Sequence, residues 1–530
     1  MTMEAPEINL LTLNCWGLLY LSSLRVPRLT QIGHTIAATS PAPSIVCLQE
    51  CWTQEDYLAI RRLTAHILPH GKFFHSGVFG AGLAVLSRWP IEETSMLRYP
   101  LNGRPTAFFR GDWFVGKGVA AARIRFGPRR GDVVEVFNTH THAPYEKEGP
   151  RDSYVCHRTA QAWEVAKLVR AARERGHLVV AMGDFNMVPS SLAHRIVTVA
   201  GGVRDVWRVV HPDSALGPAG DAEERKRGRP VPTAEENVRV NGVTSNSVYN
   251  TWRWTKRERK MLGEGKEGRV VSPAEPDPRG QRLDYIFVGD GEREGGTWVV
   301  KDVRVGMVER HPVLGCSLSD HFSVEATLAF RTDKPPGDVV AKRVAATVST
   351  ASDDHYRREV RPEKSELTIR DENDDEALQN GVYLRSPTGS EYNVAHGSEV
   401  LDNVVGGIAK QDTALPVAAY DEILAMIHKY VAREKRQRRW RGLHFFAWIG
   451  IWIACLVGVW FVPHNYVAFI LMVLSNLGLV TGTVDGLIAL LFVNTELRAL
   501  KEFEWEILNA KAAAGGGLMA DDLDKPRRDL

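Results

Sequence analysis

Leu13-Asn14-Cys15-Trp16-Gly17 closes the first apolar run of the chain, and five further motifs of the same kind follow it. In chain order these are Leu48-Gln49-Glu50, Asn138-Thr139-His140, Gly183-Asp184-Phe185-Asn186, Arg282-Leu283-Asp284-Tyr285 and Ser319-Asp320-His321-Phe322. Each motif sets an amide, a carboxylate or an imidazole beside an apolar run of β type. A sheet presents ligands for a metal and a phosphate in this way. The motifs therefore predict one catalytic domain over residues 1–331.

Short apolar runs alternate with turn residues through this region, which is typical of a mixed α/β domain. Apolar side chains recur at intervals of three and four over 160–172, so an amphipathic helix is predicted there, ended by Gly176. The apolar pattern thins over 213–280, which predicts a solvated loop. The predicted strands are 8–13, 44–48, 83–86, 119–126, 133–137, 178–181, 284–288 and 323–330.

The composition limits the classes of partner. The chain has 530 residues, with 66 basic and 64 acidic side chains and a formal net charge of +2. This balance gives no general attraction to nucleic acid, so we expect no nucleic-acid partner. The six cysteines show no zinc-type pairing and predict buried, reduced thiols. The first nine residues lack a basic and apolar signal sequence, so a cytosolic start is expected.

The C-terminal part of the chain differs in kind from the rest. Residues 443–462 form an apolar run of bilayer-spanning length, whose one basic member is His444. A second run, 466–493, follows after three residues, so the two spans predict a tight transmembrane hairpin over 443–493. The remaining predicted parts are a charged, largely irregular linker over 332–420, a basic juxtamembrane helix over 421–442 and a tail over 494–530.

Charge at the ends of the hairpin predicts its orientation. The residues before the first span include Arg433, Lys435, Arg436, Arg438, Arg439 and Arg441, whereas the loop between the spans has no Lys or Arg. The positive-inside rule therefore places the catalytic domain and both termini in the cytosol of a two-span membrane protein. Asp485 is expected near the interface, or facing the partner helix or a lipid headgroup. Hairpins can also pair between chains, so a homo-oligomer stays open. The alternative reading is a pair of buried core helices in a soluble domain.

Hydrolysis of a phosphodiester requires a cation, a base for the attacking water, and donors around the phosphoryl oxygens. Glu50 ends an apolar strand and is an oxygen ligand suited to Mg²⁺. Asn14 ends the first strand and is suited to a phosphate oxygen or a metal-bound water. Asp184 and Asn186 lie two residues apart, point to the same side, and are able to orient nucleophile and phosphate.

The imidazoles supply candidates for proton transfer. His321 is suited to the role of general base if a carboxylate fixes its tautomer. Asp284 is the candidate for that carboxylate. His140 is then a second imidazole, placed to donate to the phosphoryl oxygens. We interpret His142 and His157 as structural histidines.

Taken together, these residues resemble the endonuclease/exonuclease/phosphatase superfamily. The resemblance covers residues 8–330 and implies a two-layer β-sandwich flanked by helices, with the site at one end of the sandwich. Within the superfamily the chain is most similar to the neutral sphingomyelinases and their fungal relatives that cleave inositol phosphosphingolipids. That closer likeness rests on the Leu-Asn-Cys-Trp-Gly opening, on Asn250-Thr251-Trp252-Arg253-Trp254, on Gly111-Asp112-Trp113-Phe114-Val115-Gly116-Lys117-Gly118 and on the two-span anchor.

The resemblance implies roles for named residues. Glu50 is then the metal ligand, with Asn14 and Asp320 beside it, and His321 is the base. Asp284 is implied as the partner of His321, and the site is completed by His140, Asp184 and Asn186. The family also uses an Asp and a Lys near the active site at the spacing of Asp112 and Lys117. The segment 111–118 nearly matches a phosphate-binding P-loop, but Gly118 stands where that loop needs Ser or Thr, so we do not expect an NTPase.

The sequence thus predicts a membrane-anchored, Mg²⁺-dependent phospholipase C that hydrolyses phosphosphingolipids to ceramide and a phosphorylated headgroup. The basic run before the hairpin predicts anionic phospholipids as activators. The alternatives are a phosphoinositide phosphatase, a nucleic-acid endonuclease of the same superfamily, and a non-catalytic scaffold that binds anionic lipid. Trp252 and Trp254 are expected in the core or on a lipid-facing rim. The choice between phosphoinositol and phosphocholine stays open, as does the identity of the membrane.

Overall fold

The computed structural model describes residues 7–144, 152–189, 191–266, 268–291, 296–332 and 414–515. The predicted linker therefore lies outside the described residues except for its two ends, as does the tail beyond residue 515. Two six-stranded sheets carry the catalytic part of the chain. The first has the order β11 (Gly296–Gly306), β12 (Ser323–Thr332), β1 (Glu7–Asn14), β2 (Ile45–Gln49), β4 (Leu83–Ser87), β3 (His70–Phe74). The second has the order β5 (Ile91–Arg98), β6 (Gly118–Arg125), β7 (Val133–His140), β8 (Leu178–Asp184), β10 (Asp284–Gly289), β9 (Arg204–Asp205).

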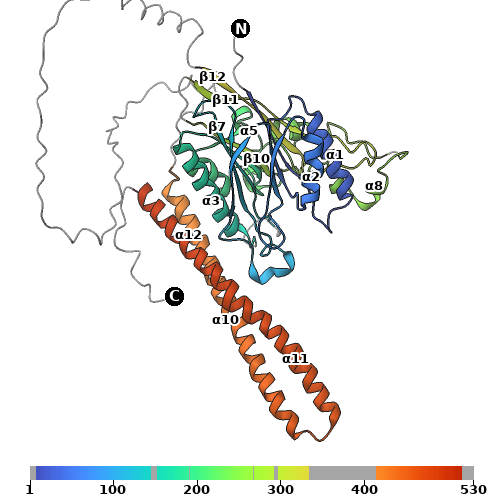
Figure 1. Cartoon of the computed structure of the whole chain (residues 1–530), viewed down its shortest axis with the longest axis vertical. Coiled ribbons are helices and arrows are strands. Elements are labelled where there is room, and N and C mark those ends of the chain that lie inside the picture. The colour runs from blue at the N-terminus through green and yellow to red at the C-terminus, as the bar shows by residue number, and fades with distance from the viewer. Residues whose placement is uncertain are drawn as a thin grey trace, which may run out of the picture. The chain divides into compact units, whose positions relative to one another are not determined.

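The two sheets pack face to face around one apolar layer. Ile8, Val85 and Leu328 from the first sheet meet Val134, Val180 and Ile286 from the second in a single buried cluster. The outer face of the first sheet is covered by α1 (Arg25–Ala38) and α2 (Gln54–Thr64). The outer face of the second sheet is covered by α3 (Val155–Glu174), which contains the predicted helix 160–172 (Figure 1). The predicted two-layer sandwich flanked by helices is confirmed.

The segment predicted as a solvated loop, 213–280, is instead partly helical, and that prediction is wrong. It encloses a small core of its own, in which Trp254 packs with Ala234 and Val271. The segment contains short helices of about one turn, each with a capping box, which its sparse apolar pattern did not predict. The remaining short helices of the domain are α4 (Leu192–Arg195), α5 (Val206–Val210), α6 (Ala222–Lys226), α7 (Ala234–Glu236) and α8 (Lys256–Lys260), the 3₁₀ turns η1 (Pro105–Arg110) and η4 (Thr251–Arg253), and the π turns η2 (Ile196–Ala200) and η3 (Asn237–Asn241).

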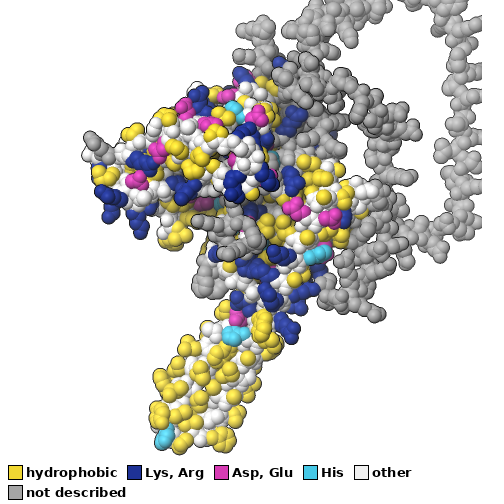
Figure 2. Space-filling model, turned by 180° about the vertical axis from the view of Figure 1, so that it is seen from behind, with side chains coloured by type: hydrophobic (Ala, Val, Ile, Leu, Met, Phe, Trp, Pro, Cys, Tyr) yellow, Lys and Arg dark blue, Asp and Glu magenta, His cyan; other side chains and the backbone are white. Residues whose placement is uncertain are grey.

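The C-terminal residues form a long helical hairpin. Its elements are α10 (Val417–Gly458), η6 (Val459–Phe461), α11 (Asn465–Leu487), η7 (Ile488–Phe492) and α12 (Val493–Ala514). Both arms are long and apolar enough to cross a membrane, and their most apolar windows are only 6% and 17% buried inside the protein. They are therefore not the core of a soluble domain within the described residues. Figure 2 shows the lower hairpin covered by hydrophobic side chains, with basic side chains gathered where it meets the rest of the protein.

The two arms of the hairpin fit each other closely. Gly478, Gly482 and Gly486 follow at intervals of four on α11. An added Cβ would lie 1.9 Å and 2.8 Å from Trp448 at the first two positions, and 2.7 Å from Phe445 at the third. Asp485 pairs with Arg441 and, at 2.7 Å, with His444 Nδ1 of α10. Asp485 thus faces the partner helix, one of the three positions expected for it.

The stem of the hairpin shares a core with the catalytic domain. Ile423 and Ile427 of α10 and Phe503 of α12 belong to the same buried cluster as Val165 and Val169 of α3. Around it, Trp163 Nε1 donates to Glu506 Oε2 at 2.6 Å and Tyr430 donates to Glu496 at 2.7 Å. His157 Nε2 lies 3.1 Å from the same Glu496 carboxylate. The first part of the predicted tail is therefore an ordered helix.

One buried amide connects the two sheets directly. Asn138 of β7 is fully buried, and its Nδ2 donates to the carbonyls of Leu48 at 3.0 Å and Ala84 at 2.9 Å in the opposite sheet. Its Oδ1 accepts from Gln49 Nε2 at 2.7 Å. The register of the two layers beside the last residues of β2 and β7 is set by these three bonds.

We expect Asn138→Ala to lower the free energy of unfolding by about 3 kcal/mol, because buried carbonyls and the Gln49 amide lose their partner. Asn9→Ala removes an amide whose bond to the Ala42 carbonyl is exposed and whose bond from the Thr327 hydroxyl is part-buried, and should cost about 1 kcal/mol. Denaturant titration of both purified variants in detergent measures the difference. Equal losses in the two variants would contradict the bridging role of Asn138.

Candidate active site

The strand-end motifs meet at one end of the sandwich. β1 and β2 run parallel and place Asn14 opposite Gln49, so the carboxyl ends of both strands share an edge. In the second sheet, His140 lies opposite Asp184, and Asp184 lies opposite Asp284. The structure therefore brings together polar side chains that are up to 307 residues apart in the chain, Asn14 to His321.

Asp184 lies at the centre of this group. Its Oδ2 accepts from Asn14 Nδ2 at 3.0 Å, and lies 3.5 Å from His140 Nε2 and 3.9 Å from His321 Nε2. Burial raises the pKa of Asp184 to about 6, although the nearby His321 charge acts in the opposite direction. Nitrogen donors surround the Asp184 carboxylate, but its raised pKa shows that they do not fully stabilise its negative charge.

The turn after β8 fixes Asp184 and Asn186. Gly183 has φ +146°, and a Cβ there would lie 1.9 Å from the Thr139 carbonyl oxygen, so only glycine allows β7 and β8 to approach so closely. Asn186 adopts φ 46° and donates its backbone N–H to Asp184 Oδ1 at 2.9 Å. Its side chain donates to the Thr141 carbonyl at 3.1 Å. The Gly-Asp-Phe-Asn motif is thus a turn that is fixed by hydrogen bonds between its side chains and the backbone.

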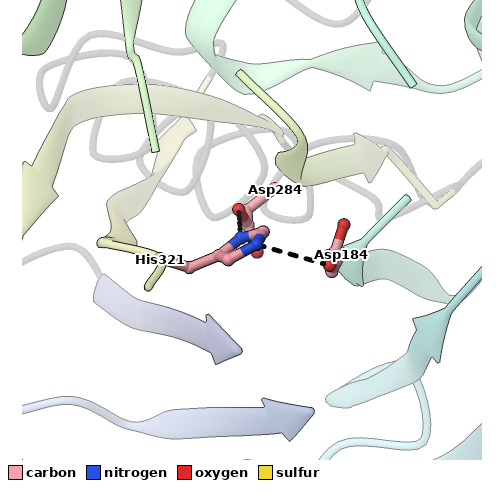
Figure 3. Close-up of side chains that lie close together, drawn as sticks. All are labelled: Asp184, Asp284 and His321. Atoms are coloured by element: carbon pink, nitrogen blue, oxygen red, sulfur yellow. Dashed lines mark hydrogen bonds and ion pairs between the residues drawn. The ribbon is translucent and has the colours of Figure 1, made fainter. Parts of the chain in front are cut away.

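His321 and Asp284 form a close buried pair. His321 Nδ1 lies 2.7 Å from Asp284 Oδ2, while its Nε2 points toward Asp184 (Figure 3). Burial alone would lower the pKa of His321, but the Asp284 and Asp184 carboxylates outweigh it and raise that pKa well above its usual value. The 3.9 Å between Nε2 and Asp184 exceeds a hydrogen bond, so Nε2 is available to a third group.

Glu50 stands at the other side of Asn14. Asn14 Nδ2 donates to Glu50 Oε1 at 3.2 Å, whereas Glu50 Oε2 is buried without a hydrogen-bond partner. Burial, and then the charge of Asp320, raise the pKa of Glu50 to about 7. Asp320 also has a raised pKa, chiefly through its own burial. The Glu50 and Asp320 carboxylates therefore lie close enough for the charge of one to disfavour the charge of the other.

This donor set fits a divalent cation. Glu50 Oε2 offers an uncommitted oxygen, and the Asp320 carboxylate acts on it from nearby, whereas the Asn14 oxygen accepts from the Trp16 N–H and has one lone pair left for a cation. The ligand atoms of Asp184, Asp284 and His321 also lie within 4.8 Å of one another. Since His321 Nδ1 is already held by Asp284, we consider the Glu50 side the better place for a cation.

Asp112 and Lys117 reach the same end of the sandwich. Lys117 Nζ is buried and donates to the Thr141 carbonyl at 3.1 Å, next to the turn that holds Asn186. Burial lowers the pKa of Lys117, and the charges of Asp112, Glu50 and Asp184 act against that effect. Asp112 Oδ1 lies 3.7 Å from His142 Nδ1. The structure therefore places the lysine charge next to the carboxylates and the aspartate slightly farther back.

The sequence did not predict the support beneath Asn14 and Asp320. Arg28 is fully buried and donates to the carbonyls of Cys15, directly after Asn14, at 3.2 Å and of Leu318, two residues before Asp320, at 2.6 Å. Its guanidinium lies 4.6 Å from the Trp16 ring, and that ring packs 4.7 Å from Trp252. Arg28 occupies the buried face of α1, one turn before Ile32, and this position was the available signal.

Comparisons with known proteins agree with this geometry. Residues 11–321 match the model of the Endonuclease/Exonuclease/phosphatase family. The chain is 31% identical to "Inositol phosphosphingolipids phospholipase C" of Saccharomyces cerevisiae over 96% of this chain and 91% of that protein. It is 42% identical to the protein of that name from Schizosaccharomyces pombe over 63% of this chain and 71% of that protein. It is also 34% identical to "Sphingomyelin phosphodiesterase 2" of Rattus norvegicus over 38% of this chain and 46% of that protein.

The chain belongs to the inositol phosphosphingolipid phospholipase C and neutral sphingomyelinase family. The resemblance seen in the motifs is thereby confirmed. Membership also makes the chain a phosphoric diester hydrolase. Family enzymes generally depend on a divalent metal, and the clustered carboxylates are consistent with that requirement.

A divalent cation should stabilise the protein through Glu50. A ligand at about 100 times its dissociation constant stabilises the folded state by about 2.7 kcal/mol, so Mg²⁺ should raise the thermal midpoint of the wild type. Glu50→Gln should abolish most of this increase, whereas Glu93→Gln, at an exposed position of β5, should retain it. Thermal unfolding with Mg²⁺ and with EDTA gives the answer. A full increase in the Glu50 variant would place the cation elsewhere.

Proposed function

We propose that this chain is a Mg²⁺-dependent phospholipase C that hydrolyses a phosphosphingolipid to ceramide and a phosphorylated headgroup. The observation that carries the proposal is the buried His321–Asp284 pair, whose free Nε2 faces the space lined by Asp184. A base is held there beside carboxylates suited to a cation. This is the arrangement that hydrolysis of a phosphodiester by water requires.

His321 is the proposed general base. Its Nε2 takes the proton of a water that attacks phosphorus, as the bond from phosphorus to the ceramide oxygen breaks and that oxygen takes up a proton from solvent. Asp284 holds Nδ1 and stabilises the imidazolium that forms. In the unneutralised site, Asp184 and Asp284 keep His321 protonated. Neutralisation of the acidic group by a cation therefore moves His321 toward the neutral form that a base requires.

Glu50, Asn14 and Asp320 are the proposed residues for Mg²⁺. When bound, the cation supplies positive charge to the phosphoryl oxygens, and an all-oxygen donor set favours Mg²⁺ over softer metals. The Asn14 amide connects this group to Asp184 through its bonds to both carboxylates. A shift in one half of the site would therefore be transmitted to the other.

The remaining site residues are proposed to hold the phosphoryl group. His140 Nε2 and the Asn186 amide lie on either side of Asp184, and Lys117 brings a full positive charge to the same edge. Burial lowers the pKa of His140, so a neutral imidazole is expected, which donates from one nitrogen. Asp112, through its charge, favours the protonated form of Lys117.

We infer a phosphoinositol headgroup in preference to phosphocholine. The support is the extent of the longest match: one relative named for inositol phosphosphingolipids aligns over 96% of this chain, whereas the sphingomyelinase of Drosophila melanogaster aligns over 61% and the sphingomyelin phosphodiesterase over 38%. A phosphatase would release inorganic phosphate, and an endonuclease would cut DNA. A scaffold would bind lipid with no turnover. Each alternative therefore has its own readout.

The hairpin is proposed to cross the membrane twice, with the catalytic domain and both termini in the cytosol. The support is the apolar surface of its lower part and the basic band above it (Figure 2). Because the substrate stays in the bilayer, an anchor raises its effective concentration at the site. Trp448 and Phe445 of the same chain occupy the space beside the glycines of α11, so a homo-oligomer would have to use another face of the hairpin.

Anionic phospholipids are proposed as activators. A cleft of about 1000 Å³ lies between α10 and the region before α3, and its lining includes Arg104, Lys429, Arg433 and Arg436. Asp152 and Glu422 are the acidic side chains in the same lining, so basic groups predominate. A lipid phosphate beside the membrane would meet these cations at short range, where they attract it most strongly.

His321→Gln should lower kcat by a factor on the order of 10² to 10⁴, since the proton acceptor is lost. His66→Gln, at an exposed position of the same domain, is the matched control and should keep wild-type turnover. The assay supplies inositol phosphoceramide and sphingomyelin separately, in micelles with and without phosphatidylserine, with Mg²⁺ or EDTA. Turnover of the His321 variant within threefold of wild type would refute the proposed base.

Replacement of residues 446–482 by a short Gly/Ser connection should release the protein from membranes, because it removes the apolar arms and keeps the stem on α3. Alkaline carbonate extraction followed by centrifugation measures the release. A matched variant with only Pro463 to Asn465 changed to Gly-Ser-Gly should stay in the membrane pellet. Retention of the shortened protein in the pellet would show that the hairpin is not the anchor.

A further inference from the structure

Two apolar side chains project into solvent beside the active-site end of the sandwich. Val78 is 77% exposed and Phe79 is 60% exposed, in the turn between β3 and β4. An isolated exposed apolar side chain is ordinary on a protein surface, but adjacent ones next to further aromatic rings form a patch. Phe79 lies 6.0 Å from Phe114 in an edge-to-face contact. We name Val78, Phe79, Trp113 and Phe114 the aromatic rim.

The aromatic rim is attached to the active site by main-chain bonds. The N–H groups of Val78 and Phe79 both donate to the Phe114 carbonyl, at 3.0 and 3.3 Å, and Gly77 pairs with Val115. A Cβ on Gly77 would lie 2.3 Å from the Gly116 nitrogen, so the two loops touch without room for a side chain. Lys117 follows directly, with its ammonium group in the site. A displacement of the aromatic rim would therefore act on the chain within three residues of Lys117.

The aromatic rim also continues into the hairpin. The Trp113 ring lies 5.4 Å from the Phe492 ring of η7, and η1 contacts η7 as well. In Figure 1, the light-blue segment near residue 110 lies beside the upper part of the hairpin. Phe492 is seven residues beyond Asp485, or about 10 Å farther along the helix axis. Asp485, with Arg441 and His444, marks the charged end of the apolar arms, so the proposed span would place Trp113 at headgroup depth above it.

We propose that the aromatic rim is a second membrane-contact surface, which enters the headgroup region of the bilayer that anchors the hairpin. The inference rests on the proposed function for its substrate and on the proposed span for its depth. Its own support is the exposed Val78 and Phe79 and their continuity with Phe492 through the two aromatic contacts. Trp side chains favour this zone of a membrane because most of the ring is apolar, while the indole N–H can bond to water or to a headgroup.

This contact would bring the mouth of the site to the lipid. A phosphosphingolipid has its phosphodiester at headgroup depth, the depth that the proposed span would give Trp113 beside Phe492. The hairpin by itself holds the protein at the membrane, whereas the aromatic rim would orient the site toward it. The two functions should therefore separate experimentally.

Binding is tested with a fluorescent label at residue 78. Five of the six cysteines are buried, and the sixth, Cys455, lies in the apolar arm, so Val78→Cys in a Cys455→Ala background takes a thiol-reactive NBD label selectively. The full chain is reconstituted into phosphatidylcholine/phosphatidylserine vesicles with doxyl-labelled lipid. We expect a blue-shifted emission and quenching by shallow doxyl groups. The control is Val270→Cys, at an 88% exposed valine, whose label should stay in water. Equal emission and quenching at the two positions would overturn the proposal.

Function is tested with Val78→Glu and the matched Val270→Glu. Val78→Glu should lower hydrolysis of inositol phosphoceramide in vesicles at least tenfold, leave the protein in the membrane pellet, and keep hydrolysis of a water-soluble phosphodiester within twofold. Val78→Leu should restore the vesicle rate. Unchanged hydrolysis in vesicles, or equal loss on both substrates, would overturn the proposal. If the wild type hydrolyses neither substrate, the proposed function fails, and the label experiment still decides on the membrane contact.

Discussion

The side chain of Asn138 is the interaction on which the arrangement of this protein depends. It is fully buried between the layers and bonds to Leu48, Ala84 and Gln49 of the opposite sheet. Two sheets held by apolar contacts alone resist separation but slide more easily, because such contacts are not directional. Hydrogen bonds are directional, and those of Asn138 lie one residue from Glu50 and two residues from His140. The two halves of the site come from different sheets, so their spacing is set there.

The same end of the sandwich concentrates negative charge in a place that water reaches poorly. Glu50, Asp184, Asp284 and Asp320 lie close together, and burial raises the pKa of three of them. Asn14 relieves part of the repulsion, since its one NH₂ group bonds to Glu50 and to Asp184. Lys117 and His321 bring the opposing charge. A bound cation would balance the remaining negative charge, so the arrangement of the site suits a cation-bound state.

The sequence predicted those parts of the fold whose pattern is local. Strands with continuous apolar runs, such as β2 and β8, were predictable, whereas β5 was not, since Glu92 and Glu93 lie in a strand with one exposed face. Leu500, Phe503 and Ile507 of α12 carry a helical spacing that was available but was assigned to a tail. The site motifs were found because strand ends carry them. The helix pattern could have shown that Arg28 is buried, but the bonds of Arg28 and Asn138 could not be predicted, because both depend on which distant carbonyls the fold brings near.

Buried polar contacts attach the stem of the hairpin, the proposed anchor, to the catalytic domain. A flexible tether would hold the enzyme at the membrane and leave the direction of its site undefined. Here Glu496 accepts from Tyr430 and faces His157 of α3, inside an apolar cluster. Burial and the charge of Glu496 raise the pKa of Glu434 to about 7, so that carboxyl is also poorly solvated. Separating the stem from α3 would expose this cluster and break its specific bonds, so in the proposed membrane arrangement a docked stem would keep the site at one height above the bilayer.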